Sequence, residues 1–331
     1  MPDNKVLFLA LDGADPGLLC RGMADGLLPS LAALHADSRV AELEAPRGFG
    51  SDAIWPSVYT GVDPSRHGRY YHKQEEAGSY LAGMRRHLDL AFPTVWETVA
   101  ASNAKVVIAE LPKAPGPAEH AGIEVLDWRS HYADNEFRTW PPDAREVITE
   151  RYGNPLACPC LASRYQHQNP AAALDMLEQL NATLDSTAAL ILDLVSQQQW
   201  DLFMTSIGVL HCAGHQLWHL HDPAHPWHGL AGPVEGDPLM ALYCRVDKVV
   251  GEILRALPAD CRVVCLAGPG SGGNYVRREL LDDILAKLES GPGTRSRGMG
   301  HLLKAAWYRL PAALRKRSSA LAHRIDRQLR A

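Results

Sequence analysis

One segment of this 331-residue sequence places a serine where it could attack phosphorus. Ser51 follows Gly48-Phe-Gly50 and begins a predicted helix. The free backbone N–H groups and the dipole of a helix N-terminus favour an anion such as phosphate. A metal ion could convert the hydroxyl into an alkoxide that attacks phosphorus. Ser51 is therefore a candidate nucleophile, although an isolated serine before a helix is usually only a cap.

A second segment with chemical potential is rich in histidine and follows a predicted strand at residues 201–208. If it is helical, His211, His215 and His219 lie one turn apart on one face, a spacing that lets two imidazoles bind one metal ion. Asp222 and His225 follow in a predicted loop, from which they could orient ligands or reach a substrate. The spacing predicts a metal-binding role for at least two of these histidines.

Short apolar strands must position these side chains. The run at residues 5–12 ends in Asp12 and then Gly13, as a buried parallel strand does when it brings a carboxylate to the carboxyl edge of a sheet. Further strand patterns lie at 106–109, 201–208 and 262–267, and helical patterns at 170–199 and 239–257. This alternation predicts an α/β fold, a doubly wound and mainly parallel sheet with helices on both faces.

The residues after Ser51 resemble the signature of the type I phosphodiesterase/nucleotide pyrophosphatase-like family of the alkaline phosphatase superfamily. The segment reads Ser51-Asp-Ala-Ile-Trp55-Pro-Ser-Val-Tyr-Thr60-Gly61-Val-Asp-Pro64-Ser-Arg-His67-Gly68. In the family, a Thr or Ser begins a segment similar to Thr-x-Pro-Ala-Trp-x-Ser-x-x-Thr-Gly, followed by x-x-Pro-x-x-His-Gly. The resemblance implies an alkaline phosphatase-like fold with Ser51 as the nucleophile. It also implies that His67 holds a turn rather than binding metal.

The same resemblance implies one or two divalent metal ions, with zinc the expected metal. Leu11-Asp12-Gly13 is similar to the family's first strand, whose Asp binds metal, so Asp12 takes that role. His211 and His215 match two ligand positions in a segment similar to Asp-x-x-x-His-x-x-Trp. His211 stands in place of the commoner Asp.

Two parts of the family's metal site have no counterpart in the sequence. After its third strand the family carries Ser-Asp-His-Gly, whose Asp and His bind metal, whereas this chain has Gly268 and Pro269 at those positions. A further metal-binding histidine near the family's C-terminal end has only His301 and His323 as candidates, and neither has the expected surroundings. The resemblance therefore predicts an altered metal site.

Two functions are consistent with these patterns. The first is a metal-dependent hydrolase of phosphate esters, of the phosphodiesterase or phosphatase type, acting on a small phosphorylated substrate. The alternative is a catalytically inactive relative that binds a phosphorylated ligand or a protein partner, and a truncated gene product is a third possibility. Measuring the bound metal and the turnover of phosphate esters distinguishes the first two.

Composition divides the chain into a core and a tail. Residues 1–290 are the predicted core, with a capping insertion at about 111–164 that is rich in Pro, Trp, His and charged residues. Residues 291–300 are rich in Gly, Ser and Arg and are a predicted flexible linker. Residues 301–331 are a predicted basic helical tail that could contact a membrane surface or a protein.

Bulk properties exclude several classes of protein. Hydrophobic residues make up 46% and charged residues 21%, which is typical of globular proteins, and the net charge of -5 gives no indication of nucleic-acid binding. The sequence has no signal-peptide pattern and no apolar stretch near the roughly 20 residues of a membrane span, so we expect a cytoplasmic protein. Its seven cysteines lack zinc-ribbon spacing, and most are expected to be reduced, buried thiols.

Overall fold

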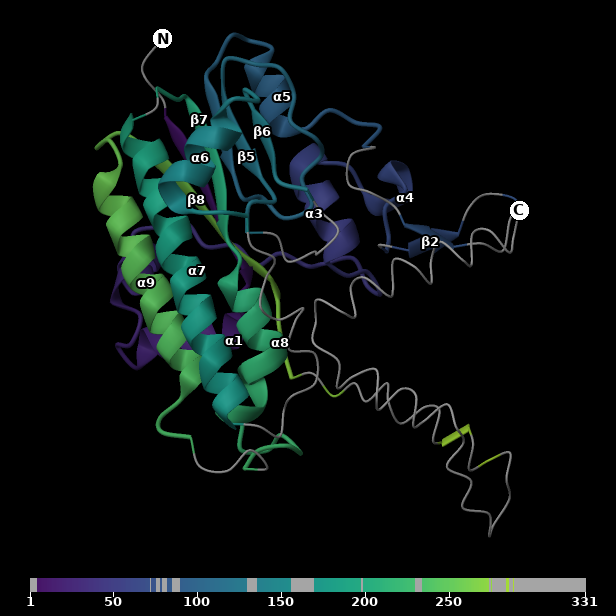
Figure 1. The fold of residues 1–331 in the computed structure, drawn as a ribbon, viewed down its shortest axis with the longest axis vertical. Helices are drawn as coiled ribbons and strands as arrows, with labels where there is room; N and C mark the ends of the chain where they lie inside the picture. Colours follow the sequence, from purple (N-terminus) through teal and green to yellow (C-terminus); the bar gives the residue numbers. More distant parts are fainter. Residues whose placement is uncertain are drawn as a thin grey trace. The chain divides into compact units, whose positions relative to one another are not determined.

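The computed structural model describes residues 5–71, 73–75, 78, 82–84, 90–129, 136–155, 170–197, 199–229, 234–273, 275, 284–285 and 288. The chain divides into two compact units, Met1–Asn274 and Tyr275–Ala331. All of the strands and helices named below belong to the first unit (Figure 1). The predicted linker at 291–300, the predicted tail at 301–331 and His301 lie outside the described residues.

A six-stranded sheet forms the centre of the first unit, with the strand order β6-β5-β4-β7-β1-β8. Its strands are β1 (Val6–Gly13), β4 (Val106–Ala109), β5 (Gly122–Leu126), β6 (Arg138–Trp140), β7 (Leu202–Ile207) and β8 (Arg262–Gly270). Neighbouring strands are parallel except for the antiparallel pair of β5 and β6. A separate antiparallel hairpin pairs β2 (Lys73–Glu75) with β3 (Ala82–Met84). The predicted, mainly parallel sheet is confirmed.

Helices cover both faces of this sheet. On one face, the larger core contains residues of α1 (Pro16–Ala24), α2 (Pro29–Ala36), α6 (Ala144–Tyr152), α7 (Pro170–Gln197), α8 (Val209–His221) and α9 (Pro238–Ala256). On the other face, a second core contains residues of α3 (Ser51–Thr60) and α5 (Val95–Ala100), and the short helix α4 (Pro64–His67) packs against α3. Figure 1 shows α7 and α9 side by side over the sheet, and they are in contact.

The central strands read as continuous apolar runs because both of their faces are buried. Leu7, Leu9 and Leu11 of β1 lie in the larger core, whereas Ala10 lies in the second core with Trp55. Successive side chains of a strand point to opposite faces, so one strand supplies both cores.

The range at 111–164, predicted to form a cap, extends the sheet in its described part. β5 and β6 come from this range, and β5 pairs in parallel with β4. Its strands are only five and three residues long and lie among prolines and charged residues, so their periodicity is weak. A capping role for the rest of this range stays a prediction.

Strand β8 ends later than the sequence pattern indicates. The apolar run stops at residue 267, but the strand continues to Gly270 and includes Pro269. β8 lies at the edge of the sheet, and a strand there has a neighbour on only one side. A proline is tolerated in such a strand where its missing N–H would have faced the unpaired side. The positions predicted to follow the strand therefore belong to it.

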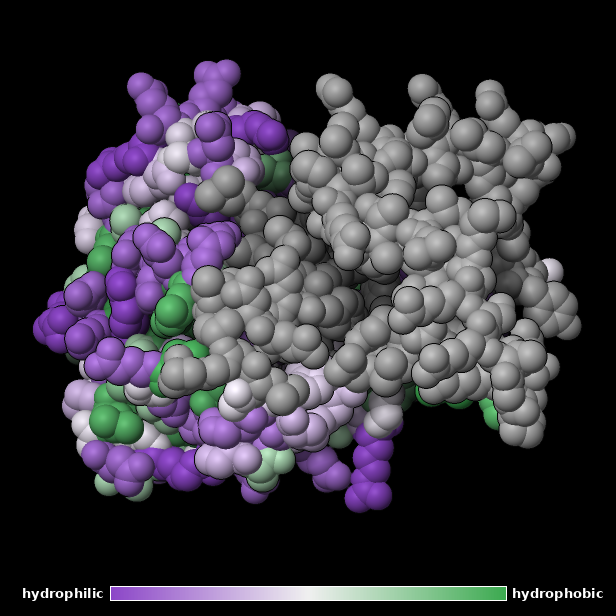
Figure 2. Space-filling view, turned by 60° about the horizontal axis from the view of Figure 1, so that its bottom comes forward, coloured by the Kyte–Doolittle hydropathy of each residue, from purple (hydrophilic) through white to green (hydrophobic). Residues whose placement is uncertain are grey.

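On the face in Figure 2, the described surface is mostly hydrophilic, with hydrophobic residues scattered among hydrophilic ones. Among the described helices, none combines the length and the apolar character that crossing a membrane requires.

Cys20, Cys244, Cys261 and Cys265 are free, and Cys212 is disulfide-bonded. Cys20 and Cys265 are exposed, so the expectation of buried thiols is wrong for these two, because they lie on an outer helix and the edge strand.

Candidate active site

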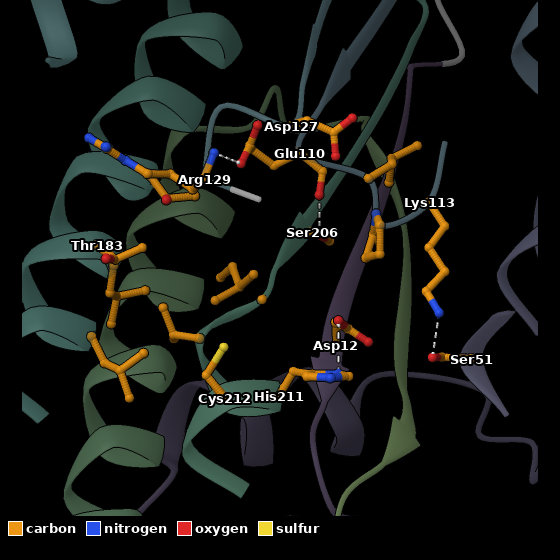
Figure 3. Close-up of a pocket in the computed structure, with 18 of the residues that line it drawn as sticks. Asp12, Ser51, Glu110, Lys113, Asp127, Arg129, Thr183, Ser206, His211 and Cys212 are labelled. Atoms are coloured by element: carbon orange, nitrogen blue, oxygen red, sulfur yellow. Dashed lines mark hydrogen bonds and ion pairs between the residues drawn. The ribbon is translucent and has the colours of Figure 1, made fainter. Parts of the chain in front are cut away.

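A pocket lies at the carboxyl edge of the sheet, where the chain leaves β1, β4, β5 and β7. In doubly wound folds this edge is the usual place for a ligand. Figure 3 shows the side chains that converge there from these segments and from α3 and α8. Its charged and polar side chains include Asp12, Ser51, Glu110, Lys113, Asp127, Arg129, Ser206 and His211.

The predicted nucleophile lines this pocket at the start of α3. Gly50 is the N-cap, Ser51 is the first helical residue, and Asp52 places a carboxylate in the first turn. The first N–H groups of a helix have no partner within it, so they can receive an anion near Ser51. Trp55 and Tyr59, one and two turns further along, are fully buried and fix α3 against the sheet.

A lysine that sequence reasoning missed holds the Ser51 hydroxyl. Lys113 Nζ donates to Ser51 Oγ at 2.8 Å and to Asp52 Oδ1 at 2.5 Å. The Lys113 side chain is only 2% exposed. Burial lowers the pKa of Lys113, while the carboxylates of Asp52 and Asp12 act in the opposite direction. A positively charged or proton-accepting group thus lies directly against the candidate nucleophile.

Strained backbone marks the same pocket. Among the described residues, four non-glycine residues have a positive φ, and three of them line the pocket: Glu110 at 54°, Lys113 at 58° and Asp127 at 59°. Such conformations cost free energy and persist only where the surrounding structure imposes them. Their concentration in the pocket that Ser51 lines supports a functional role for this edge.

Glu110 ties together the segments that follow β4 and β5. Its carboxylate accepts hydrogen bonds from the backbone N–H groups of Trp128 at 2.9 Å and Arg129 at 2.8 Å. Its backbone oxygen accepts a hydrogen bond from Ser206 Oγ on β7. Burial is the main cause that raises the pKa of Glu110 to about 7. This residue holds the pocket wall that carries Arg129.

Replacing Glu110 with glutamine is expected to flatten the pH dependence of stability. The folded protein holds the Glu110 proton more tightly than the unfolded chain does, so the free energy of unfolding falls as pH rises from about 4.5 to about 7. A shift of this size corresponds to roughly 3 kcal/mol at most. Urea unfolding at pH 5 and at pH 8 measures the change. Glu150→Gln, which removes an exposed carboxylate of α6, is the control, and an unchanged slope in the Glu110 variant would contradict the assignment.

The structure brings Asp12 and His211 together at the base of the pocket. His211 Nδ1 lies 3.3 Å from Asp12 Oδ2, and the ring of His215 packs edge-on to that of His211 at 4.8 Å between centroids. Gly13 permits this approach, because a Cβ there would lie 2.3 Å from the His211 Cα and its φ is +76°. Burial, followed by the charge of His211, lowers the pKa of His215 to about 4, so His215 is neutral at neutral pH.

The remaining predicted residues lie elsewhere. His67 is buried between α3 and the turn after α4: its Nε2 lies 3.0 Å from Ser57 Oγ, and its Nδ1 accepts from the backbone N–H of Arg69 at 3.0 Å. Burial is the first cause that lowers its pKa. These contacts hold a turn.

His219, Asp222 and His225 lie at the far end of α8 and do not line the pocket. His219 and His225 are buried, with ring centroids 6.1 Å apart. Asp222 ends α8 and accepts a hydrogen bond from the backbone N–H of Ala224 at 2.9 Å. The structure therefore separates these three residues from Ser51.

The edge strand β8 carries the two positions at which the family has further metal-binding residues. Gly268 and Pro269 lie on β8 and offer no side-chain donor. Just beyond them, a Cβ at Gly214 would lie 2.4 Å from the Ser271 Cβ. The chain that follows β8 therefore packs directly against α8, without room for a larger side chain at Gly214.

The donor groups do not fit a site for two metal ions. In the part of the chain that the structure describes, no three His, Cys, Asp or Glu side chains form a group that could hold an ion. One observation points the other way, since Asp12 Oδ1 is buried and has no hydrogen-bond partner among these residues. Metal binding by Asp12, His211 and His215 therefore stays a prediction.

Comparison with known proteins assigns the family. The model of the family described as type I phosphodiesterase / nucleotide pyrophosphatase matches residues 6–287. No curated protein gives a significant match to the sequence.

The fold is similar to two crystal structures of phosphonoacetate hydrolase from Sinorhizobium meliloti 1021, one in complex with phosphonoacetate and one with phosphonoformate. Both have a TM-score of 0.50, with 15% and 16% sequence identity. The matches cover 77% and 86% of this chain but only 54% and 63% of those chains. At this identity the likeness concerns the fold alone. Because the family match extends over most of the sequence, the chain belongs to the type I phosphodiesterase / nucleotide pyrophosphatase family.

Proposed function

We propose that this protein hydrolyses esters of phosphate, with Ser51 as the nucleophile. One observation carries the proposal: Ser51 Oγ lies at the N-terminus of α3, within a pocket, and accepts a hydrogen bond from Lys113 Nζ at 2.8 Å. A nucleophile held by a potential base is the arrangement that covalent catalysis requires. Membership of the phosphodiesterase family supports the same reaction class.

The pocket supplies the elements of phosphoryl transfer. Ser51 Oγ attacks phosphorus in line with the departing oxygen, and the phosphoryl group is held on the serine before water releases it. The N-terminus of α3 and the charge of Arg129 favour the phosphate oxygens.

The proposed substrate is a small phosphorylated molecule rather than a nucleic acid. The similar solved structures hold phosphonoacetate and phosphonoformate, which are small anions with a phosphonate group. In the pocket described here, Leu180 and Leu184 of α7 lie among the lining residues together with Arg129. This mixture suits a phosphate group attached to a small, partly apolar remainder.

Several finer predictions accompany this proposal. The sequence predicts that Asp12, His211 and His215 bind zinc, and metal analysis of the purified wild type and of His215→Ala tests this prediction. A cytoplasmic location and a contact between the basic tail and a membrane surface or a protein also stay predictions. Each can be tested separately from hydrolysis.

Turnover and covalent labelling together test the proposed reaction. The purified protein is incubated with nitrophenyl phosphate mono- and diesters, with and without added zinc or manganese, and product release is followed by absorbance. Rapid acid quenching and peptide mass spectrometry then search for a phosphoryl group on Ser51. Turnover with a labelled Ser51 supports the proposal. Absence of both under all metal conditions would favour the alternative, a relative that binds a phosphorylated ligand without hydrolysing it.

A further inference from the structure

We propose that Lys113 replaces the metal ion at the nucleophile: its amine accepts the Ser51 proton as Oγ bonds to phosphorus, and this step needs no metal. The inference rests on the proposed function, because it names the base for the same serine. It goes beyond that function by assigning activation of the serine to this chain's own residues.

The geometry around Lys113 is that of a nucleophile, a base and a group that orients the base. The 2.8 Å between Lys113 Nζ and Ser51 Oγ is within the range for direct proton transfer. Asp52 Oδ1, 2.5 Å from the same nitrogen, fixes its direction. Figure 3 shows the Lys113 side chain reaching down to Ser51, with Asp12 and His211 to the left of Ser51.

The loop that carries Lys113 is fastened to the same helix as Ser51. Tyr59, two turns after Ser51 on α3, donates its hydroxyl proton to the backbone oxygen of Pro112 at 2.6 Å. The positive φ of Lys113 further shows that the surrounding structure imposes this backbone conformation. The positions of Lys113 and Ser51 relative to each other are therefore fixed by the contact of Tyr59 with Pro112 and by that of Lys113 with Asp52, as catalysis by a preorganised pair requires.

The same lysine disfavours a divalent ion at this place. In the resting state, in which Lys113 carries its proton, an ion bound to Ser51 Oγ would lie beside a buried ammonium group, and like charges at such short range repel strongly. The two positions on β8 that could have compensated, Gly268 and Pro269, offer no donor. The absence of metal-binding side chains at Gly268 and Pro269 is therefore consistent with a lysine, rather than a metal ion, at Ser51.

The proton and electron balance closes without an ion. In the resting protein, the Lys113 ammonium group first loses one proton to solvent, which leaves Nζ as an amine. Burial lowers the pKa of Lys113 and therefore favours this loss. As Oγ bonds to phosphorus, its proton passes to Nζ, the ester P–O bond breaks, and the leaving oxygen takes a proton from water. Water then attacks phosphorus and gives a proton to solvent. The Oγ–P bond breaks, and Nζ returns its proton to Oγ.

Variants at Lys113 and a chelator test this assignment. Lys113→Met removes the amine at similar volume, and Lys113→Arg keeps a positive charge that does not lose its proton. Lys105→Met, at the opposite end of β4 and exposed, is the matched control. On whichever nitrophenyl ester the wild type hydrolyses, both Lys113 variants are expected to lose about 10²- to 10⁴-fold in kcat, and the control none. Wild-type activity is expected to survive a strong chelator.

Three results would overturn the assignment: full activity of Lys113→Met, full activity of Lys113→Arg, or chelator inactivation of the wild type that zinc reverses. The chelator experiment uses the wild type, so it decides even if a variant does not fold. Lys113→Ala adds a second readout, since added alkylamines should restore part of its activity if an amine is the base. Failure of the proposed function is recognised separately, because the wild type itself would then release no product and label no serine.

Discussion

Ser51→Ala is expected to lower kcat for phosphate esters by at least about 10⁴-fold, because the variant has no oxygen to form the covalent intermediate. The structure predicts little cost in stability, since Ser51 is the first residue of α3 and the N-cap is Gly50. Initial rates with the nitrophenyl ester and acid-quench labelling measure both parts of the effect. The label on the peptide that contains Ser51 should disappear together with the rate.

Two further variants make the Ser51 result specific. Ser65→Ala removes a hydroxyl from α4, where Ser65 is exposed, and is expected to keep wild-type activity. Ser51→Thr keeps a hydroxyl at the nucleophile position and is expected to keep a measurable fraction of the rate, because the family uses either residue there. An alanine variant that retains more than about a tenth of the rate would contradict Ser51 as the nucleophile.

The central strands could be predicted because burial on two faces leaves a plain signal in the sequence. β4 was predicted at its observed residues, and β1 and β7 within one residue at each end. β5 and β6 could not be predicted in the same way, since three to five residues at the border of a sheet alternate too few times. Their partners also lie far along the chain, so no local pattern specifies the pairing.

The candidate site was predicted where it depends on local sequence. The start of α3 at Ser51, the position of Asp12 next to the last residue of β1 and the helix carrying His211 are all consequences of short segments. Their placement at one edge follows from the parallel sheet, because the carboxyl ends of its strands meet there. The close approach of His211 to Asp12 further depends on the missing side chain of Gly13. From the sequence alone, this glycine indicates only a turn after the strand.

The contact between Ser51 and Lys113 could not be read from the sequence. The two residues are 62 positions apart, and they meet because α3 packs over the end of β4. One signal was present, since Glu110 and Lys113 are the charged residues just after a predicted parallel strand. The composition of residues 111–164, which predicts a capping insertion, obscures this signal.

Trp55→Ala is expected to lower the free energy of unfolding by about 3–5 kcal/mol, which is the usual cost of removing a large aromatic side chain from a core. Trp55 is fully buried in the second core. Its ring stacks on Tyr59 at 5.7 Å between centroids, and Tyr59 meets Trp96 edge-on at 5.0 Å. Equilibrium urea unfolding, followed by tryptophan fluorescence and circular dichroism, measures the loss. A loss below about 1 kcal/mol would contradict this account of the core.

Trp55→Phe is the matched control and is expected to lose much less stability. It keeps a stacking ring, and it removes Trp55 Nε1, a buried donor with no hydrogen-bond partner among the described residues, whose burial unpaired is itself costly. The two variants are also expected to differ in kcat. Tyr59 fastens the Lys113 loop to α3 through Pro112, so the cavity in Trp55→Ala loosens the support of both Ser51 and its base. Its kcat should therefore fall under conditions where the variant is still folded, whereas Trp55→Phe should keep most of the wild-type rate.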